Sequence, residues 1–520
     1  MKMIMRGITA HQERVSSPML RFLTEINKFN VGELCGACYT AFDFSIKDLG
    51  RNLEPKKTAT VAPGQVFRED PSRPVLRTVY VRFILSLFQF GTAIVKQGVL
   101  EQRAFISPIF KYIKSDTPIL VHDILETLKT KAVNDTTIPR VAKTQAFNEW
   151  VLGHISALYT RPEPVREDGD QYNTIARCAH EFLIALCTKP GIGGVCFPDN
   201  GWYPPGVDTG KQNQRDSEGK KPGHGQKVYN RTLAAFIMTL KPFADTLQQD
   251  LLLEIFKAAP ELVAGYFVST SGGGAFTFDP KLTATWIGYC AFLTELVGLP
   301  LPKGGFGLEG ESPAQLTPPP VTTMIESILP KTCNRQALTR CLAFDNALVK
   351  FLSTRFMVTS FNKLNNVITA MEKVAETFTE GSTTAGKWLA AREELAEEFS
   401  RRMPDMSAVV VAYNSAPVIK AGGGLQREVA SKLLMKYYTL LPEVVVGKRF
   451  DVNIALGGFL SGGEGTAEEA KGMRLLEMEH LLGVAKEAGD VKWWNKSGEI
   501  FNPPETLLMR LGLIFDYLFL

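Results

Sequence analysis

The amino-acid sequence is dominated by stretches in which apolar residues recur with the period of an α-helix. In residues 119–129, the apolar positions 120, 121, 124, 125 and 128 follow the i, i+3, i+4, i+7 spacing of one helical face. We expect Asp116 to be the N-cap of this helix and Pro118 to lie in its first turn. The same pattern predicts further helices at 147–159, 175–187, 230–240, 251–258, 261–267, 282–297, 335–352, 364–378, 388–399, 425–440, 467–486 and 504–520.

Alternating, strand-like patterns are rare in this sequence. Residues 408–413 form the best of them, and a buried helix would have the same pattern. Many amphipathic helices in series predict an all-α fold, an irregular HEAT/armadillo-like α-solenoid with long polar loops. Such repeats run to about 40–47 residues, and this sequence has no clean repeat of that kind. An irregular all-α globule is therefore the alternative.

Breaks in the helical pattern indicate how the 520 residues are organised. Residues 1–298 are expected to form an amino-terminal helical-repeat region, with a mobile surface loop at about 201–226. The Pro/Gly-rich segment 299–320 is the expected linker, and residues 321–520 should contain further helical repeats. Because 507–520 is apolar and has no cap or polar tail, we expect the second region to be truncated at its carboxyl end.

Charge, cysteine content and hydropathy exclude some classes of protein. The net charge is 58 − 54 = +4, too small by itself to indicate a nucleic-acid-binding protein. The eight cysteines are irregularly spaced in a long chain, which is typical of free thiols in a reducing compartment. The most apolar run, 79–90, is interrupted by Arg82 and Gln89 and is too short to cross a bilayer, so we expect no membrane partner.

Three short motifs are compatible with chemistry, but each lacks the context that the chemistry needs. Cys35 and Cys38 form a C-x-x-C pair without the preceding strand of a thioredoxin-type site or the two further ligands of a zinc site. Residues 305–310 match G-x-G-x-x-G, but prolines surround them where a strand and a helix are required. His180-Glu181 lacks the second histidine of a zinc protease. We therefore predict no catalytic residue, metal ligand or cofactor, and no enzyme activity.

Two sets of residues are candidate contacts for RNA or for a partner protein. One is a basic stretch in which acidic residues are interleaved, which favours an ordinary solvated surface over a phosphate-binding ridge. The other is a pair of aromatic residues in a Pro/Gly-rich turn, which either pins the turn to the core or anchors a partner, with pinning favoured. The candidates are Lys47, Arg51, Lys56, Lys57, Arg73, Arg77 and Arg82 in the first set, and Trp202 and Tyr203 in the second.

Several long runs resemble the nucleolar pre-ribosomal-associated protein family of fungi. They include 17–26 (SPMLRFLTEI), 42–53 (FDFSIKDLGRNL), 73–91 (RPVLRTVYVRFILSLFQFG), 138–159 (IPRVAKTQAFNEWVLGHISALY), 197–206 (FPDNGWYPPG) and 276–292 (FTFDPKLTATWIGYCAF). The runs follow the family's order and cover about residues 17–300. Gln145 departs from the pattern, because we expect a basic residue there.

The resemblance implies a large nucleolar α-solenoid that acts early in assembly of the large ribosomal subunit, without a catalytic role. It implies a pre-ribosomal particle as the setting, with precursor rRNA and small nucleolar RNA as RNA partners. A second large solenoid scaffold, a DEAD-box helicase and small assembly factors are the implied protein partners. Two readings compete with this scaffold: an α-solenoid protein–protein adaptor without RNA contact, and an enzyme that uses Cys35 and Cys38.

Overall fold

The structure of the chain is a computed structural model. It describes residues 2–10, 12–55, 73–161, 174–189, 201–203, 230–269, 272–302, 306, 317–379, 381–417, 424–445, 450–452, 454–456 and 468–488. The regular elements within these residues are all helices, so the predicted all-α class is confirmed. The described helices fall into two compact units, α1 to α13 with residues 201–203, 302 and 306, and α14 to α23.

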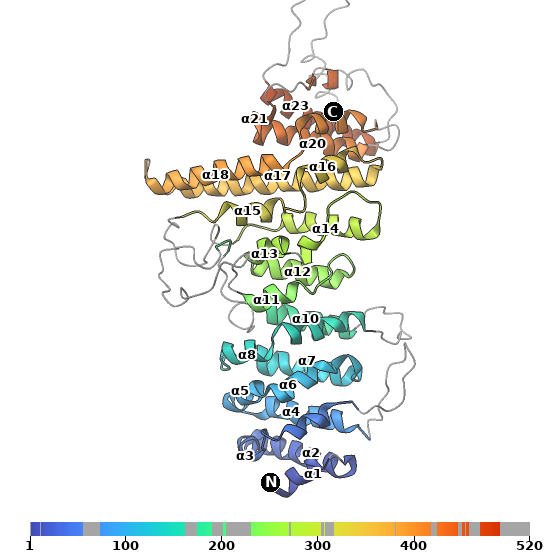
Figure 1. Cartoon of the computed structure of the whole chain (residues 1–520), viewed down its shortest axis with the longest axis vertical. Coiled ribbons are helices and arrows are strands. Elements are labelled where there is room, and N and C mark those ends of the chain that lie inside the picture. The colour runs from blue at the N-terminus through green and yellow to red at the C-terminus, as the bar shows by residue number, and fades with distance from the viewer. Residues whose placement is uncertain are drawn as a thin grey trace, which may run out of the picture. The chain divides into compact units, whose positions relative to one another are not determined.

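Unit 1 is a succession of short and medium-length helices (Figure 1). They are α1 (Lys2–Thr9), α2 (Glu13–Lys28), η1 (Phe29–Gly32), α3 (Cys35–Ala41), η2 (Lys47–Leu53), α4 (Leu76–Phe90), α5 (Ala93–Glu101), α6 (Arg103–Lys111), η3 (Ile113–Ser115), α7 (Pro118–Leu128), the π-helical η4 (Lys129–Val133), α8 (Arg140–Ala146), α9 (Glu149–Ser156), η5 (Ala157–Thr160), α10 (Thr174–Thr188), α11 (Arg231–Ile237), α12 (Thr246–Ala258) and α13 (Leu262–Val268).

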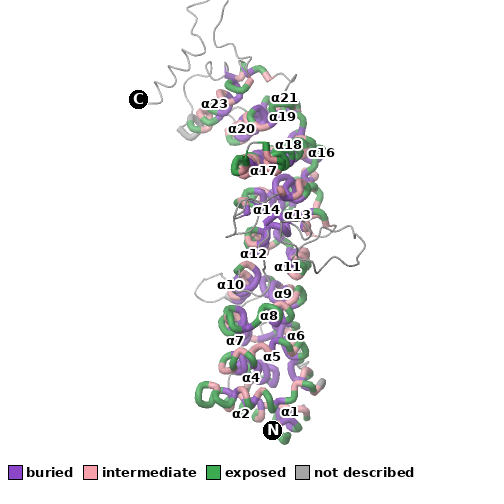
Figure 2. The backbone as a smooth tube through the Cα atoms, turned by 90° about the vertical axis from the view of Figure 1, so that its left-hand side faces the viewer, coloured by how far each residue is buried: buried purple, intermediate pink, exposed green. Residues whose placement is uncertain are grey.

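The helices of unit 1 pack in two rows. In one row, α2 contacts α4, α4 contacts α7, α7 contacts α10 and α10 contacts α12. In the other, α5 contacts α8, α6 contacts α9, α9 contacts α11 and α11 contacts α13. Figure 2 shows buried residues along the faces where these helices meet. A helix that covers neighbours on one side and meets solvent on the other is amphipathic, as most of these sequences are.

α4 is the most enclosed helix of unit 1. Every residue from Leu76 to Phe88 is buried except Arg82. This enclosure explains why the sequence of α4 is the most apolar run of the chain, since α2 and α7 cover it from both sides. Within the described residues, no helix combines the length and the hydropathy that crossing a bilayer requires.

Unit 2 is built around one long helix, α17, which has 30 residues. Its helices are α14 (Ala284–Gly298), α15 (Val321–Ile328), α16 (Arg335–Ala343), α17 (Ala347–Glu376), α18 (Thr383–Arg402), α19 (Met406–Ser415), α20 (Gly424–Leu440), α21 (Pro442–Val445) and α23 (Glu468–Ala488), and the 3-10 turn η6 (Gly272–Ala275) precedes them. α17 packs against α14, α16, α18 and α20, and α20 packs against α23.

Some helix boundaries differ from those predicted. The segment 335–352 is not one helix, because the chain breaks at 344–346 and the Asn346 side chain accepts hydrogen bonds from the N–H groups of Leu348 and Val349 at 3.1 and 3.2 Å. α17 then continues without interruption to Glu376, so the segment 364–378 is its second half. The strand-like residues 408–413 lie in helix α19, as the alternative interpretation allowed.

The predicted division at 299–320 remains a prediction. The helix α14 belongs with unit 2, and Phe306, inside the expected linker, belongs with unit 1. Residues 201–203, at the start of the expected surface loop, are buried, and 204–226 lie outside the described residues. The predicted helix at 504–520 also lies outside them.

Candidate partner- and RNA-contact residues

The candidate basic residues differ in exposure, and one of those that the structure describes is buried. Arg51 in η2, Arg73 just before α4, and Arg82 in α4 have exposed side chains. Lys47 is the first residue of η2, and Lys56 and Lys57 lie outside the described residues. Arg77, one and a half turns before Arg82 in the same helix, points into the protein.

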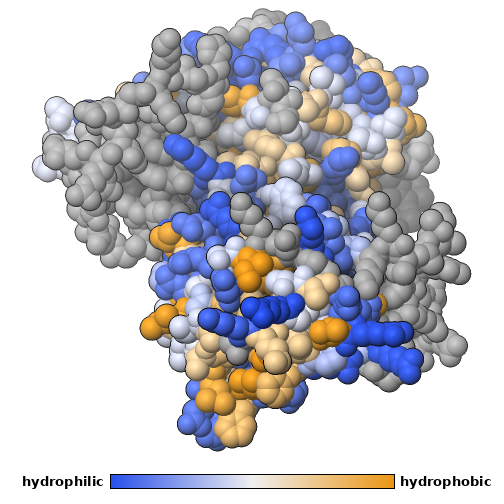
Figure 3. All heavy atoms as spheres, turned by 60° about the horizontal axis from the view of Figure 1, so that its bottom comes forward, coloured by the Kyte–Doolittle hydropathy of each residue, from blue (hydrophilic) through white to orange (hydrophobic). Residues whose placement is uncertain are grey.

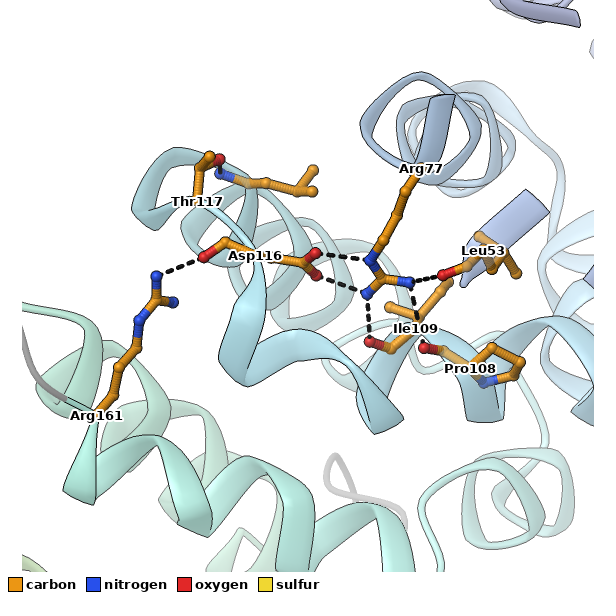
Figure 4. A network of polar contacts seen from close by, with 8 residues as sticks. Leu53, Arg77, Pro108, Ile109, Asp116, Thr117 and Arg161 are labelled. Carbon is orange, nitrogen blue, oxygen red and sulfur yellow. Dashed lines mark hydrogen bonds and ion pairs between the residues drawn. The ribbon is translucent and has the colours of Figure 1, made fainter. Parts of the chain in front are cut away.

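The guanidinium group of Arg77 is fully engaged inside unit 1 (Figure 4). Its Nε and Nη2 atoms donate to the two carboxylate oxygens of Asp116, each at 2.6 Å, in a bidentate ion pair. Nη2 also donates to the carbonyl of Ile109 at 3.0 Å, and Nη1 donates to the carbonyls of Leu53 and Pro108. We call this arrangement the Arg77 clamp.

The Arg77 clamp joins parts of the chain that are far apart in sequence. It links α4 to the end of η2, to the last turn of α6 and to the residue two before α7. The Asp116 carbonyl in turn accepts a hydrogen bond from Arg161, at the end of η5. Only 4% of the Arg77 side chain is exposed, so Arg77 is not available to a phosphate group in this structure.

Asp116 therefore has a different role from the predicted one. The N-cap of α7 is Thr117, whose hydroxyl oxygen accepts a hydrogen bond from the Leu120 N–H at 3.4 Å. Pro118 occupies the first turn of α7, as predicted. The Asp116 carboxylate is turned toward Arg77, because burying the guanidinium group requires a partner of opposite charge.

The two aromatic candidates are buried. Trp202 and Tyr203 are each 2% exposed. The backbone N–H of Trp202 donates to the backbone carbonyl of Phe306 at 3.1 Å. The Trp202 and Phe306 rings pack with their centroids 5.7 Å apart. This geometry supports the interpretation that the pair pins its turn to the core, and it leaves neither ring exposed for a partner.

The C-x-x-C pair has the electrostatics of ordinary core thiols. Cys35 and Cys38 lie in the first turn of α3 and are both buried. Burial raises the pKa of Cys35, and burial together with the charge of Cys35 raises the pKa of Cys38 to about 11. A reactive cysteine needs a lowered pKa, so neither thiol is activated here. Among the described residues, no group of three His, Cys, Asp or Glu side chains is arranged to hold a metal ion.

Two exposed arginines that the sequence analysis did not single out lie on α2, the helix that packs against α4. Arg14 and Arg21 project from α2, which packs against α4, and the Asn27 amide of α2 donates to Ser86 of α4 at 2.9 Å. The seven-residue spacing of Arg14, Arg21 and Lys28 was the available signal, because residues seven apart lie on one helical face.

Comparison with known protein families shows to which family the chain belongs. Residues 1–289 match the family described as Npa1, ribosome 60S biogenesis N-terminal. The chain belongs to the Npa1 family. The matched region of the Npa1 family covers the helices α1 to α13 of unit 1 and ends within α14.

Curated relatives extend the match beyond this region. The chain is 24% identical over 522 aligned residues to Nucleolar pre-ribosomal-associated protein 1 of Saccharomyces cerevisiae, an alignment that covers 98% of this chain and 27% of the yeast protein. It is 26% identical over 465 residues to the Homo sapiens protein of the same name, covering 82% of this chain and 19% of the human protein. The chain thus spans about a quarter or less of the length of these Npa1-family relatives.

A solved structure of an engineered protein aligns with the chain at 12% identity and a TM-score of 0.26, covering 92% of this chain and 98% of that one. A score this low says nothing about the fold of the Npa1-family chain.

The segment 138–159, one of the runs that carry the family resemblance, contains α8 and α9. Lys143 in this segment is buried, and its ammonium group donates to the carbonyls of Val133 and Asp135 at 2.8 and 2.7 Å. Lys143 thereby ties α8 to Val133, the last residue of the π-helix η4, and to Asp135 just after it. Its role in this Npa1-family chain is structural.

Proposed function

We propose that the chain is a non-catalytic scaffold in early assembly of the large ribosomal subunit, supporting pre-rRNA processing and compaction by docking proteins and RNA. The observation that carries this proposal is the Npa1-family match over residues 1–289. The names of the yeast and human relatives, nucleolar and pre-ribosomal-associated, support a nucleolar location and association with pre-60S particles.

The scaffold role includes a proposal about architecture. The helices of each unit form an irregular HEAT/armadillo-like α-solenoid. The row of α2, α4, α7, α10 and α12 in unit 1, in which each helix packs on the next, supports this view. In unit 2 the succession α14, α17, α20 and α23 supports it in the same way. Such stacks offer long surfaces to several partners at once.

The proposed RNA contacts are the exposed basic residues of α2, η2 and α4. Arg14, Arg21 and Arg82 project from two helices that pack together, and Arg51 and Arg73 are exposed nearby in the sequence. Exposed guanidinium groups bind phosphate by bidentate hydrogen bonds without reading sequence. This suits the precursor rRNA and small nucleolar RNA that the family resemblance implies.

The protein partners follow from the family resemblance. They are a second large solenoid scaffold, a DEAD-box helicase and small assembly factors. The absence of catalytic chemistry is supported by Cys35 and Cys38, whose thiols are buried and have raised pKa values.

Affinity purification tests the scaffold role. The tagged chain, expressed in cells, should recover early large-subunit precursors and their rRNA. Replacement of Arg14, Arg21 and Arg82 with Glu should reduce RNA crosslinking to the chain and leave its folding unchanged. Folded chain that recovers no large-subunit precursor would refute the proposal.

The alternative is a protein–protein adaptor without RNA contact. It is favoured by the small net charge and by the burial of Arg77, which removes one residue from the predicted basic surface. Recovery of pre-60S proteins with no RNA crosslinked to the chain would select this alternative.

A further inference from the structure

The long helix α17 of unit 2 carries a stripe of polar residues along its exposed side. Alternating intervals of four and three positions separate these residues, so they lie on one face of the helix. All of them are exposed except Thr359, which is half-buried. A helix rises about 1.5 Å per residue, so the stripe is about 27 Å long. We call it the α17 polar stripe, and its members are Arg355, Thr359, Asn362, Asn366, Thr369 and Lys373.

The α17 polar stripe contains no carboxylate. The sequence has no Asp or Glu between Asp345 and Glu372. The carboxylate of Glu372 pairs with Arg392 of α18 at 2.8 Å, and Glu376 follows the last residue of the stripe. The stripe therefore combines two cations with uncharged hydrogen-bonding side chains over about five helical turns.

Arg355 differs from other arginines of unit 2. Among the residues that the structure describes, no carboxylate pairs with Arg355, and its side chain is exposed. An exposed guanidinium group in this state keeps its planar set of N–H donors for an external anion. By contrast, arginines on α16, α18 and α20 each pair with a carboxylate, namely Arg335, Arg340, Arg392, Arg401, Arg402 and Arg427.

The neighbouring helix α18 is an example of an ordinary solvated face. Glu393, Glu394, Glu397 and Arg401 are exposed on it, and Arg401 pairs with Glu397 at 2.6 Å. Opposite charges interleaved in this way are typical of a helical face that meets solvent. The α17 polar stripe lacks such interleaving, so a solvated face of the ordinary kind does not explain its composition.

The helices that flank α17 leave the positive sign of the stripe unchanged. α14 packs on one side, where Gly298 lies next to Thr359, and α20 packs on the other, where the rings of Tyr437 and Phe361 have centroids 5.0 Å apart. Apart from Arg427, which is paired, α14 and α20 carry two acids and two lysines that are exposed or half-buried, namely Glu295, Glu428, Lys432 and Lys436. These four charges cancel, so the two cations of the stripe determine the sign of the face.

The composition of the stripe fits a nucleic-acid backbone better than a protein surface. Arginine, lysine, threonine and asparagine side chains all donate to phosphate and sugar oxygens, and nucleic-acid interfaces are more polar and more positive than protein interfaces. A protein interface usually has apolar and aromatic residues in its core. Figure 3 shows hydrophobic residues gathered at the end of unit 1 that comes forward. Between Arg355 and Lys373, in contrast, no large apolar residue of α17 is exposed.

We propose that the α17 polar stripe binds the sugar–phosphate backbone of RNA without reading its sequence. Arg355 and Lys373 contact phosphates, and the asparagine and threonine side chains between them contact phosphate and 2′-hydroxyl oxygens. The proposal rests on the RNA-docking part of the proposed function. It adds a contact surface in unit 2 that shares no residue with the RNA contacts of α2, η2 and α4.

Site-specific photo-crosslinking in cells identifies what the stripe contacts. A photo-reactive amino acid is placed in the full chain at position 366 and, as the matched control, at position 394, because Asn366 and Glu394 are both exposed on neighbouring long helices. The expected result is an RNA crosslink from position 366 and none above background from position 394. A crosslink from position 366 to a protein, including a second copy, or no crosslink above the control, would overturn the proposal.

Binding of mixed-sequence single-stranded RNA to the purified chain tests the chemistry. The chain already carries Arg14→Glu, Arg21→Glu and Arg82→Glu, so that the contacts proposed for unit 1 do not contribute. Arg355→Ala with Lys373→Ala should weaken binding. It should also reduce the slope of log K against log salt concentration by about 1.4, since each phosphate contact of a single strand accounts for about 0.7.

Two further double variants separate contact from net charge. Asn362→Ala with Asn366→Ala should weaken binding without changing the slope, because uncharged side chains release no counterions. Lys331→Ala with Lys387→Ala removes the same charge at two exposed positions of unit 2 outside the stripe, and it should bind like the parent chain. Circular dichroism checks that each variant is folded.

Three results of the binding measurements would overturn the proposal. They are equal weakening by the Lys331 and Lys387 control, an unchanged slope for the Arg355 and Lys373 variant, and no RNA binding by the parent chain. Each of them can occur while the wild-type chain still recovers pre-60S particles. Failure of the inference is therefore distinguishable from failure of the scaffold role.

Discussion

Replacement of Arg77 by Ala tests whether the Arg77 clamp stabilises unit 1. The substitution leaves the Asp116 carboxylate buried without its bidentate partner, and it leaves the carbonyls of Leu53, Pro108 and Ile109 without the donor they share. Removal of one partner of a buried ion pair typically costs about 3–5 kcal/mol. For a unit of this size, that corresponds to a fall in Tm on the order of 10 °C.

Arg82→Ala is the matched control for this prediction. Arg82 lies in the same helix but is exposed, so its replacement should change the free energy of unfolding by less than about 0.5 kcal/mol. Denaturant titrations of the purified chain, followed by circular dichroism, measure both variants. Arg77→Lys should fall between them, because lysine keeps the charge but lacks the planar, bidentate donor.

Two results would refute this account of Arg77. If Arg77→Ala unfolds within about 0.5 kcal/mol of the wild-type chain, the clamp contributes nothing to stability. If Arg77→Ala also reduces RNA crosslinking as much as Arg82→Ala does, then Arg77 reaches the surface and belongs to the RNA contacts.

Further measurements probe other parts of the molecule. Burial lowers the pKa of His480 to about 4 from an ordinary value near 6.5. As the pH falls, the unfolded chain therefore binds a proton before the folded chain does, and the stability of unit 2 should fall between pH 6.5 and 4. His480→Asn should flatten this part of the profile of stability against pH, and an unchanged profile would contradict the assignment. Cys35 and Cys38, with pKa values raised by burial, should resist alkylation at pH 8 until denaturant is added; rapid labelling of the folded chain would show an activated thiol. Gly32→Ala should destabilise unit 1 by more than about 1 kcal/mol in the same titrations, because the added methyl group meets the Phe90 carbonyl at a positive φ; a neutral effect would show that the turn rearranges.

Helical periodicity predicted most of the local structure because amphipathic helices in a layered fold bury one face each. The pattern at 119–129 corresponds to α7, and Pro260 separates α12 from α13 as an interior helix break should. The prediction failed where a local capping residue interrupted the helical pattern. Asn346 is a cap inside a continuous apolar pattern, and the pattern alone predicted one helix across it.

The candidate contact residues were harder to predict because exposure depends on distant partners. Arginine usually lies on the surface. Arg77 can be buried because Asp116, 39 residues later in the chain, pairs with it. Asp116 matched the sequence signal of a cap for the same reason that it suits an ion pair, namely a short carboxylate side chain near a helix start. The positive φ of Val31 could not be predicted from the sequence, because β-branched residues rarely adopt the left-handed conformation.

The Arg77 clamp also bears on how unit 1 loses its structure. In the α-solenoid that we propose, opening can begin at an end and spread repeat by repeat. The clamp and the Arg161–Asp116 hydrogen bond tie residues from Leu53 to Arg161 into one set of interactions. Hydrogen exchange should therefore report η2, α4, α6 and α7 opening together as a single cooperative block, with fraying confined to α1 and the helices beyond α9.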